Sequence, residues 1–256
     1  MPDPGASSSS LRLREILWTV GLLLVAGGVF WGFFAAIQYH WEWVSFWKYR
    51  TLILKGWGWT VLIALGALLV AVPLAFGLMM GQRSPWVGLR LACRGYVELV
   101  RGTPLLTQLM IGYYLVANAM HINEPILVGM VLLASFEAAY LAEIFRGALE
   151  SIGASQIEAA MAVGFDRAQM YRYVIIPQAM RRALPGAAGQ LASLIKDSSL
   201  LSVLGIEELT QIVKIANSAG ATAMEGYMPL AALYLALTLP LSWWARHLEG
   251  KFKYET

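Results

Sequence analysis

Three long stretches of this 256-residue chain contain no aspartate, glutamate, lysine or arginine: residues 16–39, 56–82 and 102–123. A transmembrane helix needs about 20 mainly apolar residues, because each residue rises about 1.5 Å through a hydrocarbon core of roughly 30 Å. Each stretch is long enough to cross a bilayer. Charged residues make up only 14% of the chain, against about 25% in soluble domains, so we expect an integral membrane protein.

Three further apolar stretches are less uniform. They are residues 125–149, with two glutamates and an arginine, residues 185–206, with Lys196 and Asp197, and residues 227–244, with no charge. Together the six stretches predict an all-α polytopic membrane protein with six transmembrane helices. Pro177 and Pro185 are expected to break the chain before the fifth helix.

Composition excludes several other classes of protein. The single Cys93 cannot form an internal disulfide, and the three histidines lie far apart without the spacing of metal ligands. We therefore expect no metal site. The 19 lysines and arginines stand against 16 acidic residues, a net charge of +3, which is too small for a phosphate-binding surface, so no nucleic-acid partner is expected.

Basic residues are distributed unevenly between the two sides that six helices create. With both termini in the cytoplasm, twelve lysines and arginines lie inside and four outside, as the positive-inside rule requires. Residues 1–15 are then a disordered cytoplasmic tail, residues 16–39 an additional N-terminal anchor helix rather than a cleaved signal, and residues 248–256 a second cytoplasmic tail.

The loop between the fourth and fifth stretches, residues 151–184, is the longest polar segment on the cytoplasmic side. Ser155 and Glu158 have the spacing of a capping box, so a short helix is expected to begin there. Gly164 is placed to end this helix in a left-handed conformation.

The second half of the loop carries another helix signal. Asp166 and Gln169 have the spacing of a cap, and the helix that they open is expected to stop at Pro177. The loop either lies on the lipid surface or presents its first helix to a groove in a partner protein.

The loop resembles the EAA loop of ATP-binding-cassette importer permeases. The matching residues are Glu158, Ala159, Ala160 and Gly164, followed by Val174, Ile175, Ile176 and Pro177. Val174 and Ile176 replace the isoleucine and leucine of the family pattern. The resemblance implies that Glu158, Ala159, Ala160, Gly164 and Pro177 couple the chain to an ATPase, with Glu158 facing a basic residue of that subunit.

Flanking segments resemble the polar amino-acid permeases, the histidine/glutamine/glutamate/arginine group, and within it the general L-amino-acid branch. They are residues 98–104 (ELVRGTP), 139–147 (AYLAEIFRG) and 196–200 (KDSSL). The resemblance implies a type I importer permease core of five helices over residues 56–247, preceded by the extra anchor helix.

By this resemblance the chain is the membrane-spanning subunit of an ATP-driven importer of polar L-amino acids in the bacterial inner membrane, working by alternating access. The implied partners are two ATPase subunits, a second permease chain, identical or homologous, and an external amino-acid-binding protein. The chain contains no phosphate-loop motif. We therefore expect no enzyme activity and no bound cofactor, with ATP and Mg held by the ATPase.

Ionisable side chains inside a membrane are functional candidates. Glu137 is expected about 18 Å and Lys196 about 16 Å from opposite ends of their spans, so both would lie near mid-depth, with Asp197. A carboxylate and a lysine there would complement a zwitterionic amino acid. Neutral candidates for the same site are Thr107, Gln108, Ser193 and Ser199. The alternative is that the charges only neutralise one another between helices.

Two pairs of charges are spaced one helical turn apart and are predicted to be structural ion pairs. Glu143 and Arg146 lie near the cytoplasmic end of their span, and Glu98 and Arg101 lie beside a kink expected at Pro104.

An ion-coupled or proton-coupled secondary amino-acid transporter is the alternative function, with Glu137, Lys196 and Asp197 as the relay. The EAA loop favours the importer, because a secondary carrier needs no docking helix. Outside the membrane, residues 207–227 contain an amphipathic stretch that is either an interfacial helix or a contact for the binding protein.

Overall fold

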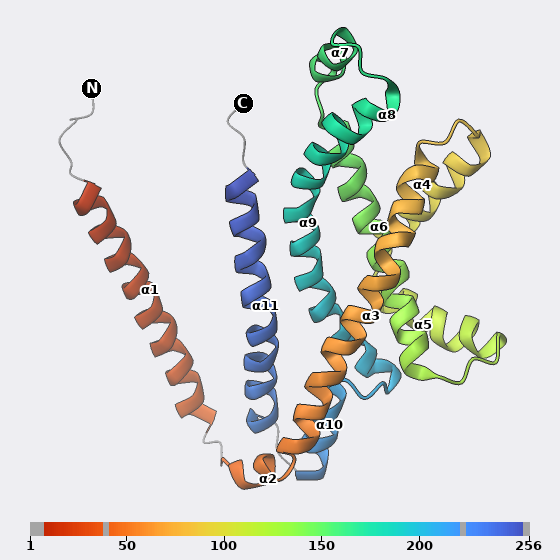
Figure 1. Cartoon of the computed structure of the whole chain (residues 1–256). Coiled ribbons are helices and arrows are strands. Elements are labelled where there is room, and N and C mark those ends of the chain that lie inside the picture. Colours follow the sequence, from red (N-terminus) through yellow and green to blue (C-terminus); the bar gives the residue numbers. More distant parts are fainter. Residues whose placement is uncertain (1–7, 38–40, 221–223, 253–256) are drawn as a thin grey trace. The chain divides into compact units, whose positions relative to one another are not determined.

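The computed structural model describes residues 8–37, 41–220 and 224–252, and the chain forms two compact units, residues 1–43 and 44–256. Within the described ranges every regular element is a helix (Figure 1), which confirms the all-α class. The helices that are long and apolar enough to cross a membrane are α1 (Ser8–Ile37), α3 (Arg50–Gln82), α6 (Pro125–Glu150) and α11 (Met224–Phe252).

Helix α1 belongs to the first unit. Its residues 16–36 have the length and hydropathy of a membrane span, as predicted, while residues 38–39 of the predicted span lie outside the described residues. The helix begins at Ser8, so the prediction of a disordered tail is wrong for residues 8–15. The leucines, arginines and glutamate of this segment are strong helix formers and extend the apolar helix outward. Residues 1–7 lie outside the described residues.

The helices α3, α6 and α11 contain three of the predicted spans. Helix α11 continues to Phe252, so residues 248–252 belong to the helix rather than to a separate tail. Residues 253–256 lie outside the described residues.

The third predicted span, residues 102–123, is interrupted. Helix α4 (Val87–Gly102) ends before Thr103 and Pro104, both in extended conformation, and α5 (Leu105–Met110) continues as the π-helical turn η1 (Ile111–Ala117). The chain is therefore broken at Pro104, where a kink was predicted, because the residue before a proline avoids helical backbone angles. The apolar segment that remains is only 13 residues long, so the count of six spans stays a prediction.

The predicted break at Pro177 and Pro185 is wrong. Helix α8 (Arg167–Met170) runs through the π-helical turn η2 (Tyr171–Ile175) into α9 (Ile176–Asp197). Pro177 lies inside this continuous helix, directly after η2, so its missing N–H removes one backbone hydrogen bond. The wider π turn and neighbouring helices accommodate prolines in membrane helices. The short η3 (Ser198–Leu204) then ends the predicted fifth span.

The first helix of the EAA-like loop, α7 (Ala154–Ala162), does not have the predicted capping box. Its N-cap is Gly153, with no side-chain cap. Ser155 lies inside the first turn, and Glu158 is two residues beyond the N3 position that a capping box uses. The second predicted cap is confirmed: Asp166 Oδ1 accepts from Gln169 N at 2.8 Å, and Gln169 Oε1 accepts from Asp166 N at 3.0 Å.

The end of α7 is fixed by Gly164, whose φ of 87° is left-handed as predicted. The N–H of Gly164 donates to Met161 O at 2.9 Å and that of Phe165 to Ala160 O at 3.1 Å. These two bonds are those of a Schellman motif, which satisfies the last carbonyls of the helix.

Helices α3 and α6 share the most extensive helix–helix interface of the second unit, and α9 packs between α6 and α11 (Figure 1). The buried faces of both α3 and α6 carry alanines about one turn apart, which let the two backbones approach closely, as small residues do in membrane helix pairs. They are Ala64, Ala67, Ala71 and Ala75 on α3 and Ala134, Ala138 and Ala142 on α6.

The predicted amphipathic stretch forms α10 (Leu209–Gly220). Its buried positions recur at helical spacing: Leu209, Ile212, Val213, Ala216 and Asn217. This face packs on the first turns of α3, where a Cβ at Gly56 would lie 3.0 Å from Ile212 Cγ1. The helix is thus packed against protein along one side.

Candidate functional site

Helix α7 is held along one side by η2 and α9. Ala160 is buried, Gln178 Nε2 donates to Gln156 Oε1, and Arg182 Nη1 donates to Ser151 Oγ at 2.8 Å. A small apolar cluster around Ile152, Ile175 and Ala179 supports the same junction. The loop is therefore anchored by side chains from the helix that follows it.

The other side of α7 is exposed. Glu158 and Ala159 are exposed, and two large apolar side chains lie near them, Met161 at 56% and Val163 at 76% exposure. Gly164 is also exposed, whereas Pro177 is half-buried within α9. A glutamate flanked by uncovered apolar side chains on a braced helix suits a groove in a partner.

Glu137 lies in the middle of α6 and is 0% exposed. Gln190 on α9 donates from Nε2 to Glu137 Oε2 at 3.2 Å, and Glu137 Oε1 is buried without a hydrogen-bond partner. Such orphaned oxygens are rare in native proteins and call for an explanation. Gln190 was not predicted, although it is a polar residue two helical turns before Asp197.

Lys196 and Asp197 differ in their surroundings. Lys196 is exposed, whereas Asp197 is half-buried and lies near enough to Glu137 to interact electrostatically. No ion pair joins Lys196 to Glu137 or Asp197 in the described ranges, so mutual neutralisation by contact is not what the structure contains. Ser193 and Ser199 are half-buried, and Thr107 is exposed.

The side chain of Gln108 is bound to the protein backbone and does not point into an open site. Its Nε2 donates to Val100 O at 2.7 Å, to Thr103 O at 3.1 Å and to Thr103 Oγ1 at 2.8 Å. These bonds satisfy carbonyls at the end of α4, which has no following turn to cap it. The amide nitrogen is therefore already occupied and is not available to substrate.

Replacing Gln108 by alanine should leave these carbonyls without their donor. We expect a loss of about 1–3 kcal/mol in stability, measured as a lower midpoint of thermal unfolding in detergent. The matched control is Thr107→Ala, one residue earlier on the exposed side. Equal unfolding midpoints for the two variants would contradict the capping role.

The charged residues near the ends of α3, α4 and α6 form a network. Arg146 binds Glu143 through Nε at 2.9 Å and Nη2 at 2.8 Å, so the predicted i,i+3 contact is present. Arg101 pairs with Glu143 at 3.2 Å rather than with Glu98. The predicted Glu98–Arg101 pair is therefore wrong, because the approach of α4 to α6 offers Arg101 a better-placed carboxylate.

A second buried glutamate, Glu208, was missed by sequence reasoning because two of its partners are remote in the chain. It is 0% exposed and acts as the N-cap of α10, accepting from Gln211 N at 2.9 Å. Its other oxygen accepts from Tyr234 Oη at 2.7 Å and Thr60 Oγ1 at 3.4 Å. This network joins the start of α10 to α3 and α11.

Burial raises the pKa of the Glu208 carboxyl above its ordinary value of 4.5, against the opposing effect of its hydrogen-bond donors. The folded chain therefore binds this proton more tightly than the unfolded chain, so stability falls as pH rises from about 4.5 through the raised pKa. Thermal unfolding against pH should show this fall in the wild type and a flatter profile in Glu208→Gln. The control is the exposed neighbour in Glu207→Gln, and an identical pH profile in all three proteins would contradict the prediction.

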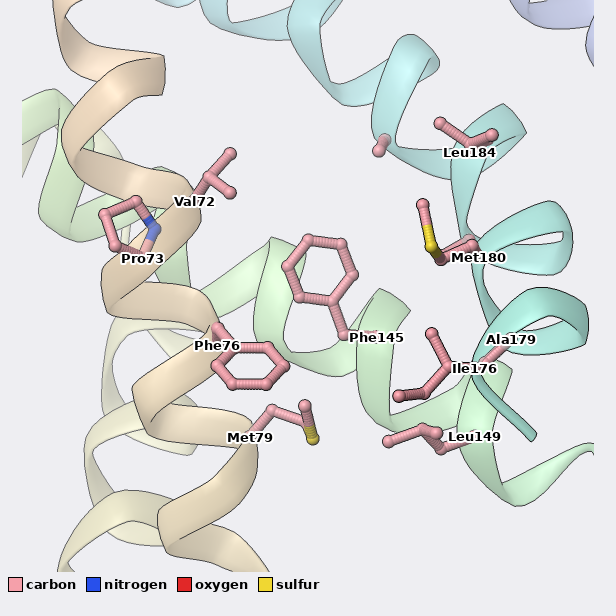
Figure 2. A pocket seen from close by; sticks show the side chains of 12 residues that line it. Val72, Pro73, Phe76, Met79, Phe145, Leu149, Ile176, Ala179, Met180 and Leu184 are labelled. Atoms are coloured by element: carbon pink, nitrogen blue, oxygen red, sulfur yellow. The ribbon is translucent and has the colours of Figure 1, made fainter. Parts of the chain in front are cut away.

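An apolar groove of about 640 Å³ lies between α3, α6 and α9. Figure 2 shows side chains from the three helices around it, among them Phe76, Phe145 and Met180. The lining offers a charged ligand no partners, and burying charge without partners is costly. This groove is therefore not a site for a polar substrate.

The arrangement defines a class of protein. Apolar helices long enough to cross a membrane, polar side chains buried between them, and a short helix exposed at one end are the parts of a transporter's membrane-spanning subunit. Residues 73–254 match the family described as binding-protein-dependent transport system inner membrane component, and the chain belongs to this family.

Curated relatives and solved structures support the same family assignment. The glutamine transport system permease protein GlnP of Escherichia coli (strain K12) is 34% identical over 220 residues, covering 83% of this chain and 98% of that protein. The octopine transport system permease protein OccM of Rhizobium radiobacter is 34% identical over 200 residues, covering 75% of this chain and 82% of the relative.

A crystal structure of an amino acid ABC transporter with histidines is similar at a TM-score of 0.77 and 30% identity, covering 83% of this chain and all 100% of that one. The inward-facing MetNI methionine ABC transporter shares the fold at a TM-score of 0.62 and 19% identity. The chain is thus a permease of the ATP-binding-cassette importers, a transport component of the inner membrane, and the secondary-transporter alternative is not supported.

Proposed function

We propose that this chain forms the membrane path of an ATP-driven importer for polar amino acids. The observation that carries the proposal is the exposed face of α7, where Glu158 lies among uncovered apolar side chains on a helix braced from behind. In the importer this face docks into an ATPase that binds ATP and Mg. Two such ATPases, a second permease chain and an external binding protein complete the assembly.

The orientation of the chain in the membrane follows from the same proposal. The ATPase lies in the cytoplasm, so the end that carries α7 is cytoplasmic, and both termini lie on that side. The opposite end, with the exposed side of α10, receives the binding protein. The six-span topology, with the α5–η1 segment as a short span, belongs to this proposal.

Substrate recognition is assigned to Glu137, Gln190 and Asp197. The free Oε1 of Glu137 can accept a hydrogen bond from a substrate ammonium, and the Gln190 bond to Oε2 holds the carboxylate in place. Because Glu137 is 0% exposed, substrate reaches it only when the helices move, as alternating access requires. Ser193 and Ser199 lie on the same helix segment as further candidates.

Assembly tests the proposal directly. The purified chain alone should hydrolyse no ATP, because no phosphate-loop motif is present. Co-expressed with a candidate ATPase, it should retain that subunit through purification and hydrolyse ATP faster when a loaded binding protein is added. Hydrolysis by the isolated chain, or failure to retain any ATPase, would overturn the assignment.

A further inference from the structure

A polar cavity of about 300 Å³ lies between the ends of α3, α4 and α6, at the end of the unit that carries α7. Its lining residues are Gln82, Arg94, Val97, Glu98, Arg101, Glu143 and Arg146. The cavity is separate from Glu137, which lies on α6 six residues before the lining residue Glu143, a separation of about 9 Å along the helix axis.

Part of the lining is neutralised within the protein. Glu143 is held by Arg146 and by Arg101, and Arg146 also contacts Glu150 Oε2 at 2.6 Å. These pairs form a fixed wall that joins α4 to α6.

The remaining charges of the lining have no such partners. Arg94 and Glu98 are exposed, line the cavity, and take part in no ion pair within the described part of the chain. Opposite charges four residues apart on a helix can pair with each other. Here each is left available to a ligand.

An amide donor lies in the same cavity. Gln82 is 4% exposed, and its Nε2 is buried beside the Glu143 carboxylate, so it supports that carboxylate and is not open to a ligand. The open groups are therefore a guanidinium and a carboxylate.

We propose that this cavity binds a free amino acid, with its α-carboxylate on Arg94 and its ammonium on Glu98. A ligand that is only an anion would be repelled by Glu98. A ligand that is only a cation would be repelled by Arg94 and Arg101. The volume lies at the small end of ligand pockets, about 300–1,000 Å³, which fits one amino acid. The inference rests on the proposed function in one respect: that function makes amino acids the product released on this side.

The test is equilibrium dialysis on the purified permease–ATPase complex, with labelled L-glutamine, L-glutamate and L-arginine as probes. All proteins carry Glu137→Gln, so that the membrane site does not contribute. This complex should still bind at least one probe. L-Glutaminamide and N-acetyl-L-glutamine, which each lack one charge of the zwitterion, should not compete.

Adding Arg94→Gln or Glu98→Gln should weaken binding at least 10-fold. Arg90→Gln is the matched control, because Arg90 lies on the same helix and contacts Ser84 O outside the cavity. No probe binding to the Glu137→Gln complex, or unchanged binding in both cavity variants, overturns the cavity site. Neither result affects the proposed function, which fails separately if no ATPase is retained.

Discussion

Replacing Glu158 by glutamine or by alanine is expected to weaken retention of the ATPase to a similar degree, by roughly 30- to 5,000-fold in affinity. Removing one partner of a buried charge pair at an interface costs about 2–5 kcal/mol, mainly through faster dissociation, and each tenfold change is about 1.4 kcal/mol. Glutamine keeps the size of the side chain but loses the charge. The two variants should agree because the N-cap of α7 is Gly153, so Glu158 has no capping bond that glutamine would preserve.

The measurement is the amount of ATPase retained on the purified permease and the rate of transport-coupled hydrolysis. Ser155→Ala is the matched control, because Ser155 is exposed on the same helix and caps nothing. If Glu158→Gln behaved as wild type while Glu158→Ala failed, the charge pair with the ATPase would be wrong.

The long apolar helices could be predicted from the sequence because their signal is local. An uninterrupted run such as residues 56–82 has only one way to satisfy its backbone in lipid. The left-handed Gly164 and the cap at Asp166 were also readable, since both depend on residues within one helical turn.

The interruptions were harder to predict because their stabilising contacts are not local. The break at Pro104 is stabilised by the Gln108 amide, which reaches back to Val100 and Thr103. A periodicity pattern does not distinguish such a break from a kink. A proline also does not by itself predict a break, because the helix continues through Pro177, which directly follows the π turn η2.

The side-chain partners in the candidate sites could not be predicted from the sequence, because they depend on how the helices pack against one another. Arg101 has Glu98 one turn away but binds Glu143 on α6. Glu208 draws donors from Thr60 and Tyr234, which are 148 and 26 residues away. Sequence spacing identified Glu137 as important, but only the packing of α6 on α9 revealed Gln190 as its partner.

Glu137→Gln is expected to reduce amino-acid uptake in reconstituted vesicles by about 10- to 150-fold while the complex remains assembled. Hydrogen bonds to charged groups contribute about 1.5–3 kcal/mol, and glutamine removes the charge while keeping the shape that packs against Gln190. Burying a neutral amide costs less than burying a charged carboxylate, so this substitution should not destabilise the fold.

Two comparisons make the uptake result specific. Glu124→Gln changes the exposed N-cap of the same helix and should leave uptake unchanged. Lys196→Met removes the exposed lysine beside Asp197 and should also impair uptake if the substrate carboxylate binds there. Normal uptake in both Glu137→Gln and Lys196→Met would mean that these charges do not touch substrate. The unpartnered Oε1 would then be a structural cost with no ligand to offset it, and the transport site would lie elsewhere between the helices.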